Sequence, residues 1–103
     1  MTINMACRKV ALEIMENDGL KTGEAINTGW CGQFSNRVAA LIPGSISRSG
    51  PGHYWVEYDG KHYDAEVPDG VIDPILIPCF QRMGYNHANR PSALTETQER
   101  SNP

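Results

Sequence analysis

The sequence predicts an α+β domain in which two N-terminal helices pack on a small antiparallel β-sheet. Apolar residues recur at helical spacing before residue 43, and two aromatic runs flank an Asp-Gly pair at residues 59–60. A chain of 103 residues supplies enough apolar surface for one core. We expect this single domain at residues 1–87, followed by a polar tail at residues 88–103 with a weak helical stretch near residues 92–100.

The first predicted helix covers residues 3–17. Thr2 can cap its start, and Gly19 can end it in a left-handed turn. Its apolar stripe predicts the buried face, and we interpret the cysteine in that stripe as a packing residue. The stripe consists of Ile3, Cys7, Val10, Ala11 and Ile14. The following residues, 20–29, are rich in glycine and polar side chains and predict a loop.

The second predicted helix begins at Trp30 or Cys31 and ends at Ile42, where Pro43 and Gly44 stop it. Cys31 precedes Phe34 by three residues, so it shares the apolar stripe while standing at the helix N-terminus. The positive end of the helix dipole and the free first-turn N–H groups favour a thiolate at that position. Cys31 is therefore a candidate nucleophile.

The strongest local signal is a hairpin at residues 53–66 with a type I′ turn at Asp59-Gly60. This turn pairs Glu57 with His62, a pair that we expect to be solvated. Strand alternation then places three further side chains on one face within reach of one another, namely His53, Trp55 and Asp64. A carboxylate beside His53 can orient the imidazole and stabilise its charged form.

Other segments around the hairpin carry weaker signals. Residues 45–52 are small and polar and predict a loop, and residues 67–70 predict a turn. Residues 71–80 are apolar but interrupted by two prolines, which favours an edge strand or an extended segment. We interpret Cys79, inside that segment, as a buried packing residue.

Packing of the second helix on the hairpin would bring Cys31 to His53 and Asp64. That set supplies a nucleophile, a general base and an orienting acid, and the first-turn backbone N–H groups can act as oxyanion donors. Trp30 would shield the site from water or form a wall of the acyl pocket. This chemistry needs no cofactor.

At these residues the sequence resembles the papain-like cysteine hydrolases, especially their transglutaminase-like branch. The matching stretches are residues 29–34, 53–57 and 62–65. The resemblance implies a minimal papain-like core and acyl transfer through a thioester, with a peptide, protein or small amide as substrate. It also implies side chains that bind substrate or oxyanion. The candidates for these roles are Trp30, Asn27, which stands near the position of the papain glutamine, Gln33 and Trp55.

Two alternatives remain open from the residues. One is a non-enzymatic binding or inhibitor protein on the same small fold, in which Cys31 is only a core residue. The other is a metal site formed by His53, His62 and Asp64, with Cys31 or His87 as an additional ligand.

Composition limits the partners and the compartment. Nine Lys and Arg against twelve Asp and Glu leave a net charge of −3, which argues against nucleic-acid binding. The chain has neither an apolar run of about 18 residues nor the basic-then-apolar order of a signal peptide. Three cysteines without regular spacing are typical of a reducing compartment. We expect a cytoplasmic protein with no membrane partner.

Overall fold

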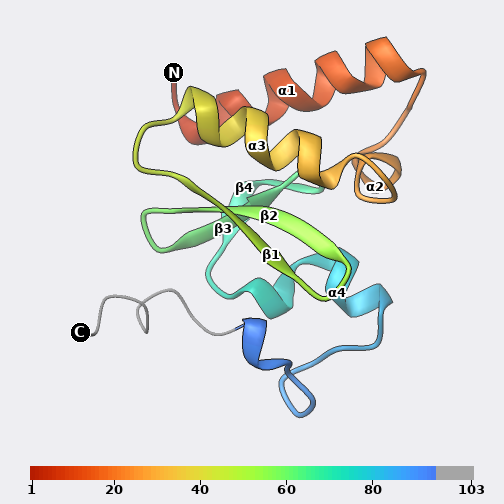
Figure 1. Cartoon of the computed structure of the whole chain (residues 1–103), viewed down its shortest axis with the longest axis vertical. Helices are drawn as coiled ribbons and strands as arrows, with labels where there is room; N and C mark the ends of the chain where they lie inside the picture. The colour runs from red at the N-terminus through yellow and green to blue at the C-terminus, as the bar shows by residue number, and fades with distance from the viewer. Residues whose placement is uncertain (95–103) are drawn as a thin grey trace.

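A four-stranded antiparallel sheet separates helices α1 and α3 from helix α4 in the computed structural model, which describes residues 1–94 (Figure 1). The strand order is β1-β2-β3-β4. The α+β class is confirmed. The helices are α1 (Ile3–Asp18), α2 (Gly23–Ile26), α3 (Cys31–Leu41) and α4 (Pro78–Arg82), and the strands are β1 (Ile46–Gly50), β2 (His53–Tyr58), β3 (Lys61–Asp64) and β4 (Val67–Val71).

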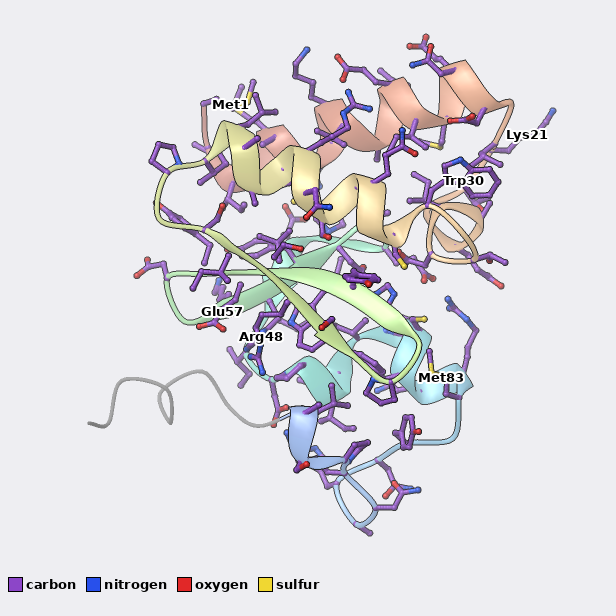
Figure 2. The ribbon with its side chains drawn as sticks, viewed as in Figure 1. Met1, Lys21, Trp30, Arg48, Glu57 and Met83 are labelled. Carbon is purple, nitrogen blue, oxygen red and sulfur yellow. The ribbon has the colours of Figure 1, made fainter. Side chains whose placement is uncertain are left out.

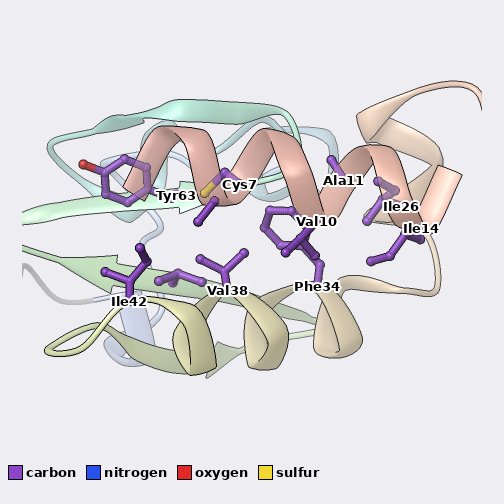
Figure 3. Packing of buried hydrophobic residues seen from close by; sticks show 11 residues of the cluster. Cys7, Val10, Ala11, Ile14, Ile26, Phe34, Val38, Ile42 and Tyr63 are labelled. Carbon is purple, nitrogen blue, oxygen red and sulfur yellow. The ribbon is translucent and has the colours of Figure 1, made fainter. Parts of the chain in front are cut away.

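Helices α1 and α3 form and pack as predicted. The Thr2 hydroxyl accepts a hydrogen bond from the backbone N–H of Met5, and Gly19 ends α1 with a φ of 70°. The apolar stripes of α1 and α3 pack against one face of strands β2 and β3 and form the larger core (Figure 3). The residues of this core are Ala6, Cys7, Val10, Ala11, Ile14, Ile26, Phe34, Val38, Ile42, Val56 and Tyr63.

The predicted hairpin is confirmed in register and in turn type. Glu57 pairs with His62, and Val56 pairs with Tyr63. Both central turn residues have positive φ, 49° at Asp59 and 81° at Gly60, as a type I′ turn requires. Because this register is set by a two-residue turn, the two faces of the hairpin follow from the sequence alone.

A second, smaller core lies on the opposite face of the sheet. Trp55 is its largest side chain and is fully buried. Its partners come mainly from residues 74–80, which we expected to be extended but which form a 3₁₀ turn, η1 (Pro74–Leu76), and α4. The side chain of Asp73 caps η1 through the backbone N–H of Ile75, and a proline begins each short helix. The expectation of an extended segment was wrong because these prolines start helices.

Three segments predicted as loops or turns contain regular structure. Residues 46–50 form β1, residues 67–71 form β4 and residues 23–26 form α2. None of these segments has alternating or helical apolar spacing, so strand pairing and tertiary packing, rather than local sequence, stabilise their regular structure. At Gly23 an added Cβ would lie 2.5 Å from the carbonyl oxygen of Ala65, so α2 requires glycine where it meets the chain after β3.

The chain beyond residue 87 also contributes to packing. Leu94 is fully buried in the smaller core, within a second 3₁₀ turn, η2 (Ser92–Leu94). Arg90 forms a two-pronged ion pair with Asp73. Residues 95–103, where most of the predicted tail and its weak helix fall, lie outside the described residues. No helix within the described range has the length and apolar character needed to cross a membrane.

Because the Cys7 thiol is buried, we predict that the protein loses stability at alkaline pH. Burial, reinforced by the Asp64 carboxylate, raises the pKa of Cys7 to about 12, whereas an unfolded cysteine titrates near about 8.5. The stability that the folded state gains from keeping this thiol protonated is therefore complete below about pH 8.5 and is lost as the pH rises toward 12. We expect this group to lower the free energy of unfolding by about 1.4 kcal/mol per pH unit in that window.

Urea unfolding at several alkaline pH values measures this slope. Cys7→Ala should remove the Cys7 part of the slope, while Cys31→Ala, at a partly exposed position, should retain it. Equal slopes in the wild type and Cys7→Ala would contradict the prediction.

Candidate active site

His53 is the first residue of β2, and its side chain is completely buried. Strand alternation directs it to the face that carries Trp55, whose ring stacks on the imidazole with centroids 6.5 Å apart. The Phe80 ring of α4 packs edge-on against the imidazole, with the two ring centroids 5.3 Å apart. These two aromatic rings hold the imidazole in one orientation.

Asp64 ends β3 beneath His53 and is also fully buried. Its Oδ1 accepts hydrogen bonds from the backbone N–H groups of Glu66 and Val67, at 2.9 and 3.1 Å. Its Oδ2 lies 2.9 Å from His53 Nε2 and accepts a 3.2 Å hydrogen bond from Asn27 Nδ2. The predicted contact between His53 and Asp64 is therefore present. Because three other N–H groups already donate to this carboxylate, it also accepts in its contact with His53, and the proton of that hydrogen bond is on Nε2.

The other imidazole nitrogen is the chemically available one. With the proton on Nε2, neutral His53 keeps a lone pair on Nδ1. Nδ1 is buried and has no hydrogen-bond partner among the described residues. Buried polar atoms are normally satisfied, and functional sites are among the places where they are not. Nδ1 is therefore the candidate base, on the side of the imidazole that faces away from Asp64.

Cys31 begins α3, and its side chain is partly buried. An ideal Cβ on the next residue, Gly32, would lie 3.5 Å from the ring of Tyr54, the residue after His53. The heads of α3 and β2 therefore lie side by side. Within residues 1–94, however, no hydrogen bond joins the Cys31 thiol to Nδ1 of His53. The structure joins His53 to Asp64 directly and brings Cys31 only into their neighbourhood.

The N-terminus of α3 offers backbone donors beside Cys31. Trp30 occupies the N-cap position, and its side chain makes no capping hydrogen bond. A helix that lacks a side-chain cap directs its first N–H groups at solvent or at a ligand. These groups and the positive end of the helix dipole suit a thiolate or an oxyanion.

Two of the four candidates for binding substrate or oxyanion must be corrected. Asn27 gives both amide protons to carboxylates, to Asp64 and, at 2.9 Å, to Glu66 Oε1, so it does not donate to an oxyanion. Trp55 is fully buried and donates its Nε1–H to His62 Nδ1, so it belongs to the core. Gln33 is exposed on α3 and Trp30 is half-buried at the α2–α3 connection (Figure 2), and both stay predictions.

The predicted metal site does not assemble. No three His, Cys, Asp or Glu side chains within residues 1–94 are arranged to hold a metal ion. Nδ1 of His62 is occupied by the indole of Trp55, although His62 shares the sheet face of His53. His87 lies on the exposed segment after α4, where its Nδ1 is 3.2 Å from Arg90.

The expected solvated pair of Glu57 and His62 is buried instead. Glu57 is 3% exposed and His62 is fully buried. Arg48 reaches from β1 to Glu57 (Figure 2), with 3.2 Å between Nη1 and Oε1. Its guanidinium lies 4.9 Å from the centroid of the Trp55 ring. The expectation of a solvated pair was wrong because η1, η2 and α4 cover this face of the sheet.

Sequence reasoning also missed contacts that cross between distant elements. Phe80 was not expected beside His53, and Asn27 was not expected as a donor to Asp64. No local spacing links these residues, because α2 and α4 reach the hairpin only through tertiary packing.

Comparison of the chain with models of protein families, with curated proteins and with solved structures finds no match. Function is therefore inferred from the side chains of the site. The site contains a buried His–Asp pair with an unpartnered Nδ1, and a cysteine at a helix N-terminus lies in its neighbourhood. Nucleophilic acyl transfer uses groups of these types.

Proposed function

We propose that this protein is a thiol-dependent hydrolase or acyltransferase in which Cys31 is the nucleophile, His53 the general base and acid, and Asp64 the orienting acid. The observation that carries the proposal is the state of His53: its Nε2 is held by Asp64, and its buried Nδ1 is unpartnered. A base of this kind needs a proton donor, and Cys31 is the partly exposed thiol at the head of α3, where the neighbouring Gly32 packs against Tyr54 of β2.

The reaction follows from these positions. Nδ1 of His53 takes the proton of the Cys31 thiol, and Sγ attacks the carbonyl carbon of an amide. First-turn N–H groups of α3 stabilise the oxyanion of the tetrahedral intermediate. The imidazolium then gives its proton to the leaving amine, and a thioester to Cys31 remains. Water or a second amine, deprotonated by His53, attacks the thioester and restores the thiol.

Formation of the Cys31–His53 hydrogen bond is a required step in this mechanism. Catalytic hydrogen bonds are often long in the free enzyme and tighten when the substrate binds. Cys31 is the first residue of α3, so rotation of its side chain moves the sulfur without moving the helix. We expect the thiol to reach Nδ1 in this way.

Two exposed apolar side chains support a substrate with an apolar acyl part. Tyr54 is 48% exposed and lies against Gly32, next to Cys31. Met83 is 42% exposed and lies against Gly52, next to His53, where an ideal glycine Cβ would be 3.4 Å from its Cε (Figure 2). We propose a peptide, protein or small amide as the substrate. All three cysteines are free, which fits the proposed cytoplasmic location.

Alkylation with iodoacetamide near neutral pH tests the proposal. Burial raises the pKa of the Cys7 and Cys79 thiols, so both should react slowly. Cys31 should react fastest, and His53→Ala should slow it by about tenfold or more, because the base that removes its proton is lost. Peptide mass mapping of the labelled cysteines gives the three rates separately.

His87→Ala is the matched control, since His87 is an exposed histidine outside the site. It should leave the rate of Cys31 unchanged. Equal rates for the three cysteines, or a rate of Cys31 that is insensitive to His53→Ala, would contradict an activated thiol and favour the binding or inhibitor alternative.

A further inference from the structure

A continuous chain of hydrogen bonds runs from α4 to the imidazole of His53. Arg82 donates through both terminal nitrogens to Glu66, at 2.9 and 2.6 Å. Oε1 of Glu66 also accepts from Asn27 Nδ2, which donates to Asp64 Oδ2 as well. That Asp64 oxygen is the one that faces His53. The exposed end of the chain is thus a two-pronged Arg–carboxylate pair, and its buried end is the candidate base.

We propose that Asn27 and the Glu66–Arg82 pair are positioning residues for His53, which hold Asp64 on Nε2 and balance the charge around the imidazole. This inference rests on the proposed function, because it assigns the same imidazole as the base. None of these three residues needs to touch substrate. They act through Asp64 and through their charges.

The position of Asn27 explains how the pair reaches Asp64. Its amide is buried between the two carboxylates and donates one proton to each. Two carboxylates joined by one amide have fixed separations, so a shift of Glu66 moves Asp64 as well. Arg82 fixes Glu66 in turn, because a two-pronged pair restricts both side chains.

Titratable side chains near His53 lie on β3, α3 and α4 and in the segment after β3. Asp64 is on β3, and Glu66 follows it in the chain. Arg82 and Cys79 are on α4, and Cys31 heads α3. Hydrogen bonds from Arg82 and Asn27 lower the pKa of Glu66, against the opposing effect of burial. Glu66 is therefore ionised at neutral pH, and Arg82 balances its charge near the imidazole.

Two single substitutions should shift the protonation of His53 in opposite directions. Arg82→Gln leaves the negative charge of Glu66 unbalanced, which favours imidazolium and raises the titration midpoint of the ring. Glu66→Gln keeps the shape and one of the two acceptor oxygens but leaves the charge of Arg82 unbalanced, which lowers the midpoint. We expect each shift to be several tenths of a pH unit, the size typical of a partly exposed charge. The measurement is a pH titration of the His53 ring protons by NMR.

Two further variants serve as controls. The double variant Glu66→Gln/Arg82→Gln removes both charges and should return the midpoint toward the wild-type value. Arg8→Gln breaks a comparable two-pronged pair with Asp69 on the surface and should leave His53 unchanged. A purely structural role for the pair would instead give shifts of one sign, or none, in both single variants.

The results separate this inference from the proposed function. Opposite shifts support the inference, and shifts of the same sign or no shifts overturn it. If Glu66→Gln does not fold, Arg82→Gln alone decides by the presence or absence of an upward shift, because Arg82 is on the surface side of the pair. If the midpoints move as expected but alkylation of Cys31 does not depend on His53, the charge-balancing role stands and the proposed function fails.

Discussion

Replacement of Asp64 by asparagine is expected to slow alkylation of Cys31 near neutral pH by about tenfold or more, and turnover of any substrate by about 10²–10⁴-fold. Asparagine can keep its Oδ1 on the backbone N–H groups of Glu66 and Val67. Its amide nitrogen then faces His53 Nε2 and requires a lone pair there. The imidazole proton moves to Nδ1, and the base that should accept the Cys31 proton is lost.

Two other substitutions define what the Asp64→Asn result means. Asp64→Ala leaves one proton of the buried Asn27 amide and two backbone N–H groups without an acceptor, so we expect a loss of about 3–5 kcal/mol in the free energy of unfolding. Asp69→Asn changes an exposed carboxylate and should alter the reactivity of Cys31 little. Wild-type reactivity in a folded Asp64→Asn variant would show that the tautomer of His53 does not control the thiol.

Replacement of Trp55 by alanine should lower the free energy of unfolding by about 3–5 kcal/mol. The indole is fully buried, donates to His62 and packs at right angles to Phe80 with centroids 5.3 Å apart. Alanine leaves a large cavity in the smaller core and removes the hydrogen bond from the indole to Nδ1 of His62. The midpoint and slope of urea unfolding measure the loss.

Trp30→Ala is the comparison for this prediction. Trp30 is half-buried and packs on the edge of the larger core, so its loss should cost less than the loss of Trp55. If Trp30 shields the proposed site, Trp30→Ala should also change the rate of Cys31 alkylation while the protein stays folded. Equal destabilisation by the two substitutions would contradict the assignment of Trp55 to the core.

The best-predicted parts of the fold are those whose signals are local. The Asp59-Gly60 turn determines the register of the hairpin, and that register puts His53 and Asp64 on one face. Thr2 and Gly19 mark the ends of α1. In each case the physical cause, a cap or a turn conformation, lies within a few residues of its effect.

The parts that were not predicted depend on partners far along the chain. β1 carries small polar residues and becomes a strand because β2 supplies its hydrogen bonds. β4 contains Pro68 and Gly70, which disfavour a strand, but an edge position tolerates a proline. The helical path of residues 74–82 depends on packing beneath Trp55. Such pairings have no local signature.

The same division holds at the candidate site. By itself, the sequence determined a cysteine at the head of a helix and a histidine and an aspartate on one hairpin face, because helix and strand periodicities are local properties. Only the tertiary structure decided that Asn27 binds Asp64 and that Glu66 pairs with Arg82, and it left Nδ1 of His53 without a partner. These contacts arise where α2, α4 and the sheet meet, and the free energy of packing the whole chain determines that meeting.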